Sequence, residues 1–182
     1  KVFDFLDDVI DEMIQLFPGE IFHIGGDEVR YNHWKESEET RKFMEEKGIQ
    51  TYPELQVWIT NLMSEKLKAK GRRMMGWNEI TGVQLHDYQQ EKVQKQEQKL
   101  SEGTIVQIWK GSPELIKATA EQGYDILNSY NRYTYLDYDY NTIPLEKAYT
   151  FNPIPTDLPK SLESKILGVG CQMWGEFIPT VK

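Results

Sequence analysis

The chain has 182 residues and a net charge of −8, and this length is enough to bury a hydrophobic core as one domain. The excess of negative charge argues against a nucleic-acid partner, because such a surface repels phosphates. No apolar run approaches the roughly 20 residues that a membrane-spanning helix needs, and a single cysteine excludes an intrachain disulfide.

The hydrophobic pattern along the chain alternates between the periods of a helix and of a strand. In chain order, the expected elements are a helix over 2–17, a strand over 20–25, helices over 36–47 and 53–70, strands over 72–77 and 104–109, a helix over 112–123, and strands over 124–130 and 166–174. Glycine or proline ends each helix, as at Pro18-Gly19 and Gly48. The very polar stretch 84–102 is expected to be a solvated helix or a mobile excursion, and 140–159 an aromatic, proline-rich loop.

Alternating helices and strands imply parallel strands joined by right-handed crossovers. We count about five strands, whereas a complete (β/α)8 barrel has eight in roughly 250 residues. We therefore predict an α/β fold of the TIM-barrel type, with residues 1–182 forming the C-terminal part, the second half, of a single catalytic barrel domain. A half-barrel exposes strand edges and apolar surface, so we also expect self-association or pairing with a missing segment.

The most informative chemical feature is the run His23-Ile-Gly-Gly-Asp27-Glu28, which follows the apolar pair Ile21-Phe22. It puts two adjacent carboxylates at the C-terminal end of a predicted strand, where the glycines let another group approach the backbone. We expect both carboxylates to be withdrawn from water. Such a pair is typical of a site in which one carboxyl group keeps its proton while the other stays ionised, as acid catalysis at a glycosidic or acyl centre requires.

Aromatic or acidic residues follow the other predicted strands as well. They are Trp77 with Glu79, Trp109, the run that begins at Tyr130, and Trp174 with Glu176. In a barrel of this type the C-terminal ends of the strands converge on the mouth that holds the active site. Trp34 and Trp58 fall within or beside predicted helices and are expected to pack there. Cys171 falls inside the last predicted strand and is expected to be a small apolar filler.

With these residues identified, the sequence resembles the family 20 glycoside hydrolases, the β-N-acetylhexosaminidases, over nearly its whole length. Its later segments resemble bacterial members most. The resemblance rests on His23-x-Gly25-Gly26-Asp27-Glu28, Gly76-Trp77-x-Glu79, Val106-Gln107-Ile108-Trp109-Lys110-Gly111, Tyr135-Leu136-Asp137, Tyr149-x-Phe151-x-Pro153 and Gly168-x-x-x-Gln172-x-Trp174-Gly175-Glu176, in that order. It implies hydrolysis of terminal β-linked N-acetylhexosamine by a substrate-assisted mechanism, in which the 2-acetamido oxygen of the sugar is the nucleophile.

The resemblance also implies a role for each site residue. Glu28 is the implied general acid, which later acts as base towards water. Asp27 is implied to accept the acetamido N–H and stabilise the oxazolinium ion, and Tyr135 to donate its hydroxyl to the acetamido oxygen. The implied sugar contacts are Trp77, Trp109 and Trp174 around the acetamido methyl group and the pyranose face, and Asp137 and Glu176 at the 4- and 6-hydroxyls.

Several interpretations remain open at this stage. We expect His23 to support the carboxylates by hydrogen bonding rather than to catalyse. Glu79 lies close to the site in the family pattern, but its role is left open. A metal site built from His23, Asp27, Glu28 and His33 fits no standard zinc spacing, so we expect neither metal nor cofactor.

The alternative function from another class is a non-catalytic module that binds N-acetylhexosamines. The presence of Asp27, Glu28 and Tyr135 together argues against it, because a binder needs no acid beside an anion. The expected partner is an oligosaccharide or glycoconjugate, and family habit implies a periplasmic or secreted protein. Because the family has further strands and a sugar-clamping arginine that this chain lacks, we expect the 182 residues alone to have little hydrolase activity.

Overall fold

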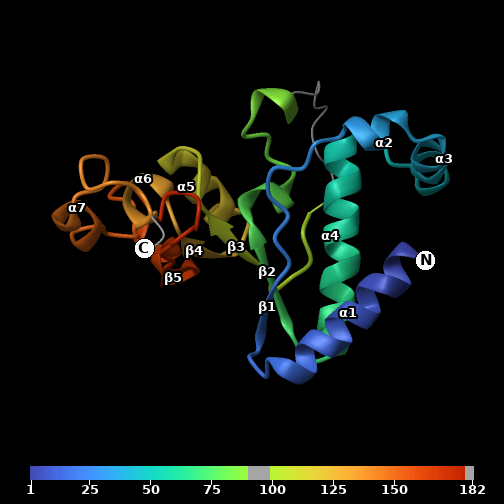
Figure 1. Cartoon of the computed structure of the whole chain (residues 1–182), viewed down its shortest axis with the longest axis horizontal. Helices are drawn as coiled ribbons and strands as arrows, with labels where there is room; N and C mark the ends of the chain where they lie inside the picture. The colour runs from blue at the N-terminus through green and yellow to red at the C-terminus, as the bar shows by residue number, and fades with distance from the viewer. Residues whose placement is uncertain (90–98, 179–182) are drawn as a thin grey trace. The chain divides into compact units, whose positions relative to one another are not determined.

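The computed structural model describes residues 1–89 and 99–178 (Figure 1). The chain divides into two compact units, Lys1–Thr104 and Ile105–Lys182. No helix among the described residues is both long enough and apolar enough to cross a membrane.

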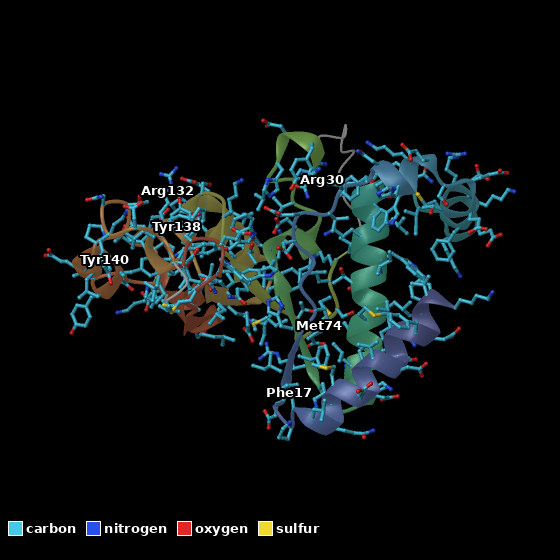
Figure 2. The ribbon with its side chains drawn as sticks, in the orientation of Figure 1. Phe17, Arg30, Met74, Arg132, Tyr138 and Tyr140 are labelled. Atoms are coloured by element: carbon cyan, nitrogen blue, oxygen red, sulfur yellow. The ribbon has the colours of Figure 1, made fainter. Side chains whose placement is uncertain are left out.

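The first unit pairs two short parallel strands and covers them with helices. Strand β1 (Ile21–His23) lies beside β2 (Arg73–Trp77), with Phe22 opposite Met74. Helix α4 contacts β2 and runs alongside both strands in Figure 1. Met74, which lies in β2, is labelled in Figure 2. The helices are α1 (Val2–Leu16), α2 (Asn32–Glu36), α3 (Glu38–Lys47) and α4 (Tyr52–Ala69), and the short 3₁₀ helices η1 (Asn78–Thr81) and η2 (Asp87–Gln89) follow β2.

Local sequence explains where α4 begins and what it packs against. Thr51 and Glu54 form a capping box, in which each side chain accepts a hydrogen bond from the backbone N–H of the other, at 3.3 and 3.1 Å. Pro53 occupies the first turn, where no backbone donor is needed. Leu55 then packs with Met44 in a small core, and Trp34 and Trp58 pack against that core as expected.

The second unit contains three parallel strands in chain order. They are β3 (Ile105–Ile108), β4 (Asp125–Asn128) and β5 (Ile166–Val169), and all four residues of β3 are buried. The helices are α5 (Pro113–Glu121), α6 (Asn131–Thr134), α7 (Leu145–Tyr149) and the 3₁₀ helix η3 (Lys160–Lys165). Tyr135 pairs with Gln172 in an isolated parallel bridge that extends the sheet pattern beyond β4 and β5.

The structure confirms the α/β class and the five strands, each of which is shorter than predicted. β1 ends at His23 rather than residue 25, because Gly25 and Gly26 adopt left-handed φ angles of 73° and 91° and turn the chain. β5 ends at Val169 rather than 174, so the prediction that Cys171 fills a buried strand is wrong, and its side chain is exposed. The predicted loop 140–159 contains helix α7.

The prediction that residues 84–102 are solvated is wrong at two of the described positions. Gln89 is 1% exposed and Leu100 is 7% exposed. The side chain of Asn61 on α4 binds the backbone on either side of Leu100. It accepts a hydrogen bond from Ser101 N at 2.8 Å and donates one to Lys99 O at 2.8 Å. Residues 90–98 lie outside the described part of the chain.

Candidate active site

A close-packed glycine turn follows β1 and carries the two adjacent carboxylates. A Cβ atom added to Gly26 would lie 2.4 Å from Cγ2 of the buried Ile80, so only glycine fits there. The carbonyl oxygen of Gly25 accepts a hydrogen bond from Trp77 N at 2.9 Å. These contacts bring the exit of β1, with Asp27 and Glu28, against the exit of β2.

Glu28 has an unusual backbone. Its φ of 52° makes it the only non-glycine residue with positive φ in residues 1–89 and 99–178. A residue with a long side chain in this conformation costs roughly 1–3 kcal/mol, and such strain clusters at functional sites. The carboxyl side chain is 56% exposed.

The expectation that both carboxylates are withdrawn from water is wrong, since Asp27 and Glu28 are both exposed. The reason is the early end of β1. Residues 24–26 turn the chain after His23, with Gly25 and Gly26 in left-handed conformations, and Asp27 and Glu28 follow this turn on the exposed side.

Glu79 lies beside the backbone of Glu28 and is fully buried. Its Oε1 accepts a hydrogen bond from Glu28 N at 3.5 Å. Gln56 of α4 ties the two exits together, since its Nε2 donates to Gly26 O at 2.8 Å and to Glu79 O at 3.3 Å. Tyr31 completes this network by donating its hydroxyl to Gln56 Oε1 at 2.9 Å. Glu79, left open from sequence, is therefore part of the frame around Glu28.

Three residues that the sequence did not mark also lie around Glu28. His86 Nε2 is 3.7 Å from Glu28 Oε1, and the ring of Tyr88 stacks on His86 with centroids 4.9 Å apart. The guanidinium of Arg30, labelled in Figure 2 on the loop after β1, lies 5.0 Å above the Tyr88 ring. Burial, followed by the negative charge of Glu28, raises the pKa of Tyr88. The only sequence signal that points to Arg30, His86 and Tyr88 is that each lies in a loop that follows a strand C-terminus.

His23 supports the backbone of the turn. Its Nδ1 accepts a hydrogen bond from Gly25 N at 3.0 Å, and its ring meets the buried Trp77 edge-on at 5.2 Å. Direct hydrogen bonding of His23 to a carboxylate stays a prediction. Within the described ranges, no three His, Cys, Asp or Glu side chains group closely enough to hold a metal ion.

In the second unit, the predicted residues after β4 form an aromatic and acidic cluster. Tyr135 is buried, and its ring stacks on that of Trp109 with centroids 6.2 Å apart. The ring of Tyr138, labelled in Figure 2, meets the Tyr135 ring edge-on with centroids 5.6 Å apart. Asp137 is 6% exposed, and among the described residues neither of its carboxylate oxygens has a hydrogen-bond partner. A buried carboxylate without donors is costly, so this oxygen pair is suited to accept hydrogen bonds from a ligand.

The segment after β5 lies beside this cluster within the same unit. Phe177 meets Tyr138 edge-on at 5.6 Å, and Gln172 O accepts a hydrogen bond from Leu136 N at 2.9 Å. The two predicted sugar contacts on this segment are exposed, with Trp174 at 45%. Their contact with a sugar stays a prediction.

Comparison with known proteins identifies relatives for the whole chain. The model of the family described as "Glycosyl hydrolase family 20, catalytic domain" matches residues 1–182. A β-hexosaminidase of Porphyromonas gingivalis is 32% identical over 99% of this chain, and one of Vibrio furnissii is 32% identical over 96%. The chain spans only 23% and 28% of those two proteins.

A solved structure shows the same likeness in fold. The family 20 exo-β-N-acetylglucosaminidase of Vibrio harveyi, crystallised with N-acetylglucosamine, superposes with a TM-score of 0.76 at 30% identity. The likeness covers 98% of this chain and 28% of that one. The predicted class, α/β of the TIM-barrel type with only part of the barrel present, is thereby confirmed.

Proposed function

The chain belongs to glycosyl hydrolase family 20, and from that membership we propose that the protein containing it removes terminal β-linked N-acetylhexosamine residues. The mechanism is retaining and substrate-assisted, with the 2-acetamido group as nucleophile. The observation that carries the proposal is the turn after β1. There Asp27 and Glu28 follow a glycine that tolerates no side chain, and Glu28 has a φ of 52°.

In the first half of the reaction, Glu28 donates its proton to the glycosidic oxygen as the bond from that oxygen to C1 breaks. The acetamido carbonyl oxygen attacks C1 and closes an oxazolinium ring. Asp27, as a carboxylate, accepts the acetamido N–H and stabilises the positive charge that develops on this group. Because the charge is greater in the transition state than in the bound substrate, this contact accelerates the step.

In the second half, water attacks C1 while the Glu28 carboxylate takes one of its protons. The oxazolinium ring opens, the acetamido group is restored, and Glu28 is again protonated. Two inversions at C1 leave the β configuration unchanged. The half-exposed side chain of Glu28 suits a group that has to reach both a leaving oxygen and an incoming water.

The remaining proposed sugar contacts are Trp77 of the first unit and five residues of the second unit. The Tyr135 hydroxyl donates to the acetamido oxygen and orients it for attack. Asp137 accepts hydrogen bonds from sugar hydroxyls, which is supported by its buried oxygens lacking donors among the described residues. Trp109, stacked on Tyr135, contacts the apolar face of the sugar. The other proposed contacts are Trp77, Trp174 and Glu176.

The proposed partner is an oligosaccharide or glycoconjugate with a terminal N-acetylhexosamine. The complex of the Vibrio harveyi enzyme with N-acetylglucosamine supports that sugar as the first to test. Because the chain spans about a quarter of its relatives, we expect the isolated 182 residues to self-associate and to have little hydrolase activity. A periplasmic or secreted location remains part of the proposal.

The test is the rate at which Glu28→Gln and Asp27→Asn variants hydrolyse N,N′-diacetylchitobiose, in the protein with its natural flanking sequence. Loss of a general acid costs roughly 10²–10⁴-fold in rate, so we expect kcat to fall by about a hundredfold or more while N-acetylglucosamine still binds. Unchanged rates overturn the assignment. A wild-type protein that binds the sugar without turnover is instead a non-catalytic relative.

A further inference from the structure

The loop after β2 places one histidine between two carboxylates. His86 Nε2 lies 3.7 Å from Glu28 Oε1 and 3.6 Å from Glu79 Oε1. Glu79 is fully buried, the Glu28 side chain is 56% exposed, and the His86 side chain is 11% exposed. The imidazole therefore links a carboxylate shielded from water to the carboxyl group that has to reach the substrate.

Side-chain hydrogen bonds fix this loop to the segment that carries Glu28. Gln89, which is 1% exposed, accepts hydrogen bonds from the backbone N–H groups of Leu85 and His86 at 3.1 and 3.2 Å. Its Nε2 donates to the carbonyl oxygen of Val29 at 3.4 Å. Because Val29 directly follows Glu28, the backbone that orients His86 and the backbone that orients Glu28 are joined through one buried amide.

Stacking restricts the ring as well. Tyr88 lies nearly parallel to His86, with an interplanar angle of 14°, and Arg30 lies over the Tyr88 ring. Gln89 thus holds the backbone of His86, and Tyr88 covers one face of the imidazole ring. Nε2 remains close to Glu28 and Glu79. Once Glu28 is a carboxylate, a lone pair on Nε2 would be repelled by its oxygen atoms, so we place the imidazole proton on Nε2.

We propose that His86 is a positioning residue for the acid, a role that rests on the proposed function of Glu28. When Glu28 has given its proton to the leaving oxygen, its carboxylate gains a donor in the Nε2–H of His86, while the stacked ring of Tyr88 keeps the imidazole oriented. Both N–O distances exceed the usual limit of about 3.2 Å, so a shift of roughly half an ångström closes either hydrogen bond. His86 thereby favours the charge that Glu28 develops in the transition state.

The test compares a substrate whose leaving group needs protonation with one whose leaving group does not. We expect His86→Ala, in the protein with its natural flanking sequence, to lower kcat for N,N′-diacetylchitobiose by about tenfold or more, the value of one charge-assisted hydrogen bond. For the 2,4-dinitrophenyl N-acetylglucosaminide, the first step needs no acid, and we expect the rate of that step, followed by the burst of dinitrophenol, to change by less than about threefold. His86→Gln, which keeps an N–H donor, is expected to retain more of the chitobiose rate than His86→Ala.

The controls separate positioning from folding and from the wider proposal. His33→Ala removes an exposed histidine from α2 of the same unit and is expected to leave both rates unchanged. If His86→Ala fails to fold, the role of His86 is tested with His86→Gln instead, by the ratio of its rate on N,N′-diacetylchitobiose to its rate on the dinitrophenyl substrate. An equal loss on both substrates, or an unchanged ratio, overturns the role of His86. Glu28→Gln is run in parallel, because a chitobiose rate that survives this change refutes the acid assignment itself.

Discussion

Replacing Gly26 with alanine perturbs the turn that positions the two carboxylates. The added Cβ would lie 2.4 Å from Cγ2 of Ile80, at a backbone φ of 91°. Ile80 is fully buried, and the clashing Cγ2 is a branch on its Cβ atom and not the far end of a flexible side chain. The backbone of the turn has to move instead, and it carries Asp27 and Glu28 with it.

Two penalties add in this variant. A left-handed backbone costs alanine roughly 1–2 kcal/mol, and overpacking a core contact costs about 1–3 kcal/mol. We therefore expect Gly26→Ala to lower the free energy of unfolding by about 2–5 kcal/mol. Gly48→Ala is the matched control, because φ is 69° there and nothing lies within 4 Å of the added Cβ, so only the first penalty applies.

Urea denaturation followed by tryptophan fluorescence measures the free energy of unfolding of both variants. The value of kcat on N,N′-diacetylchitobiose reports the displacement of the carboxylates. Ile80→Ala removes the clashing methyl group, so Gly26→Ala should cost less in that background than in the wild type. The reasoning is refuted if Gly26→Ala and Gly48→Ala lower the unfolding free energy equally, or if Gly26→Ala leaves kcat unchanged.

Three further predictions concern single charged or ionisable groups. Asp137→Asn removes a buried charge that lacks donors among the described residues, so thermal denaturation should show an unchanged or higher Tm, while KM rises by about tenfold through loss of a sugar hydrogen bond; a large drop in Tm would count against this. Burial and then the charge of Glu28 raise the pKa of Tyr88 above its ordinary 10.0, so Glu28→Gln should move the phenol titration, assigned against Tyr88→Phe, towards 10.0, and no movement would contradict the contact. The hydrogen bond from Lys66 lowers the pKa of Asp7 below its ordinary 3.8, so this pair stabilises the fold above that pH and the contribution is lost as pH falls through the lower folded-state value. Lys66→Met should accordingly lower stability near neutral pH but not well below pH 3.8, and Lys68→Met on the exposed side of α4 serves as its control.

Residues whose role follows from local pattern were predictable from sequence. The three- and four-residue spacing of apolar side chains gave α1 and α4 within a residue or two of their observed ends, and Gly48 ended α3 in the left-handed conformation expected of it. The carboxylate pair after the first strand was also evident, because Asp27 and Glu28 follow two glycines and an apolar run.

Residues whose role depends on distant contacts were not predictable in the same way. Gln89 belongs to a run of glutamines and lysines that looks solvated, yet its amide is buried. The amide joins residues 85 and 86 to Val29, which lies 60 positions before Gln89 in the sequence. His86 has no distinguishing neighbours in sequence. Its position near Glu28 depends on how the loop after β2 folds back on the loop after β1, and hydrophobic periodicity carries no information about that.

The most direct test of the central claim is the rate of the wild-type protein, with its natural flanking sequence, on aryl N-acetylglucosaminides whose acetyl group carries increasing numbers of fluorine atoms. Fluorine withdraws electrons from the acetamido oxygen and weakens it as a nucleophile without altering the leaving group. If the sugar's own amide attacks C1 while Asp27 stabilises the ring that forms, kcat should fall steeply with each fluorine, by about tenfold or more across the series. A rate that is independent of fluorine content would contradict the account.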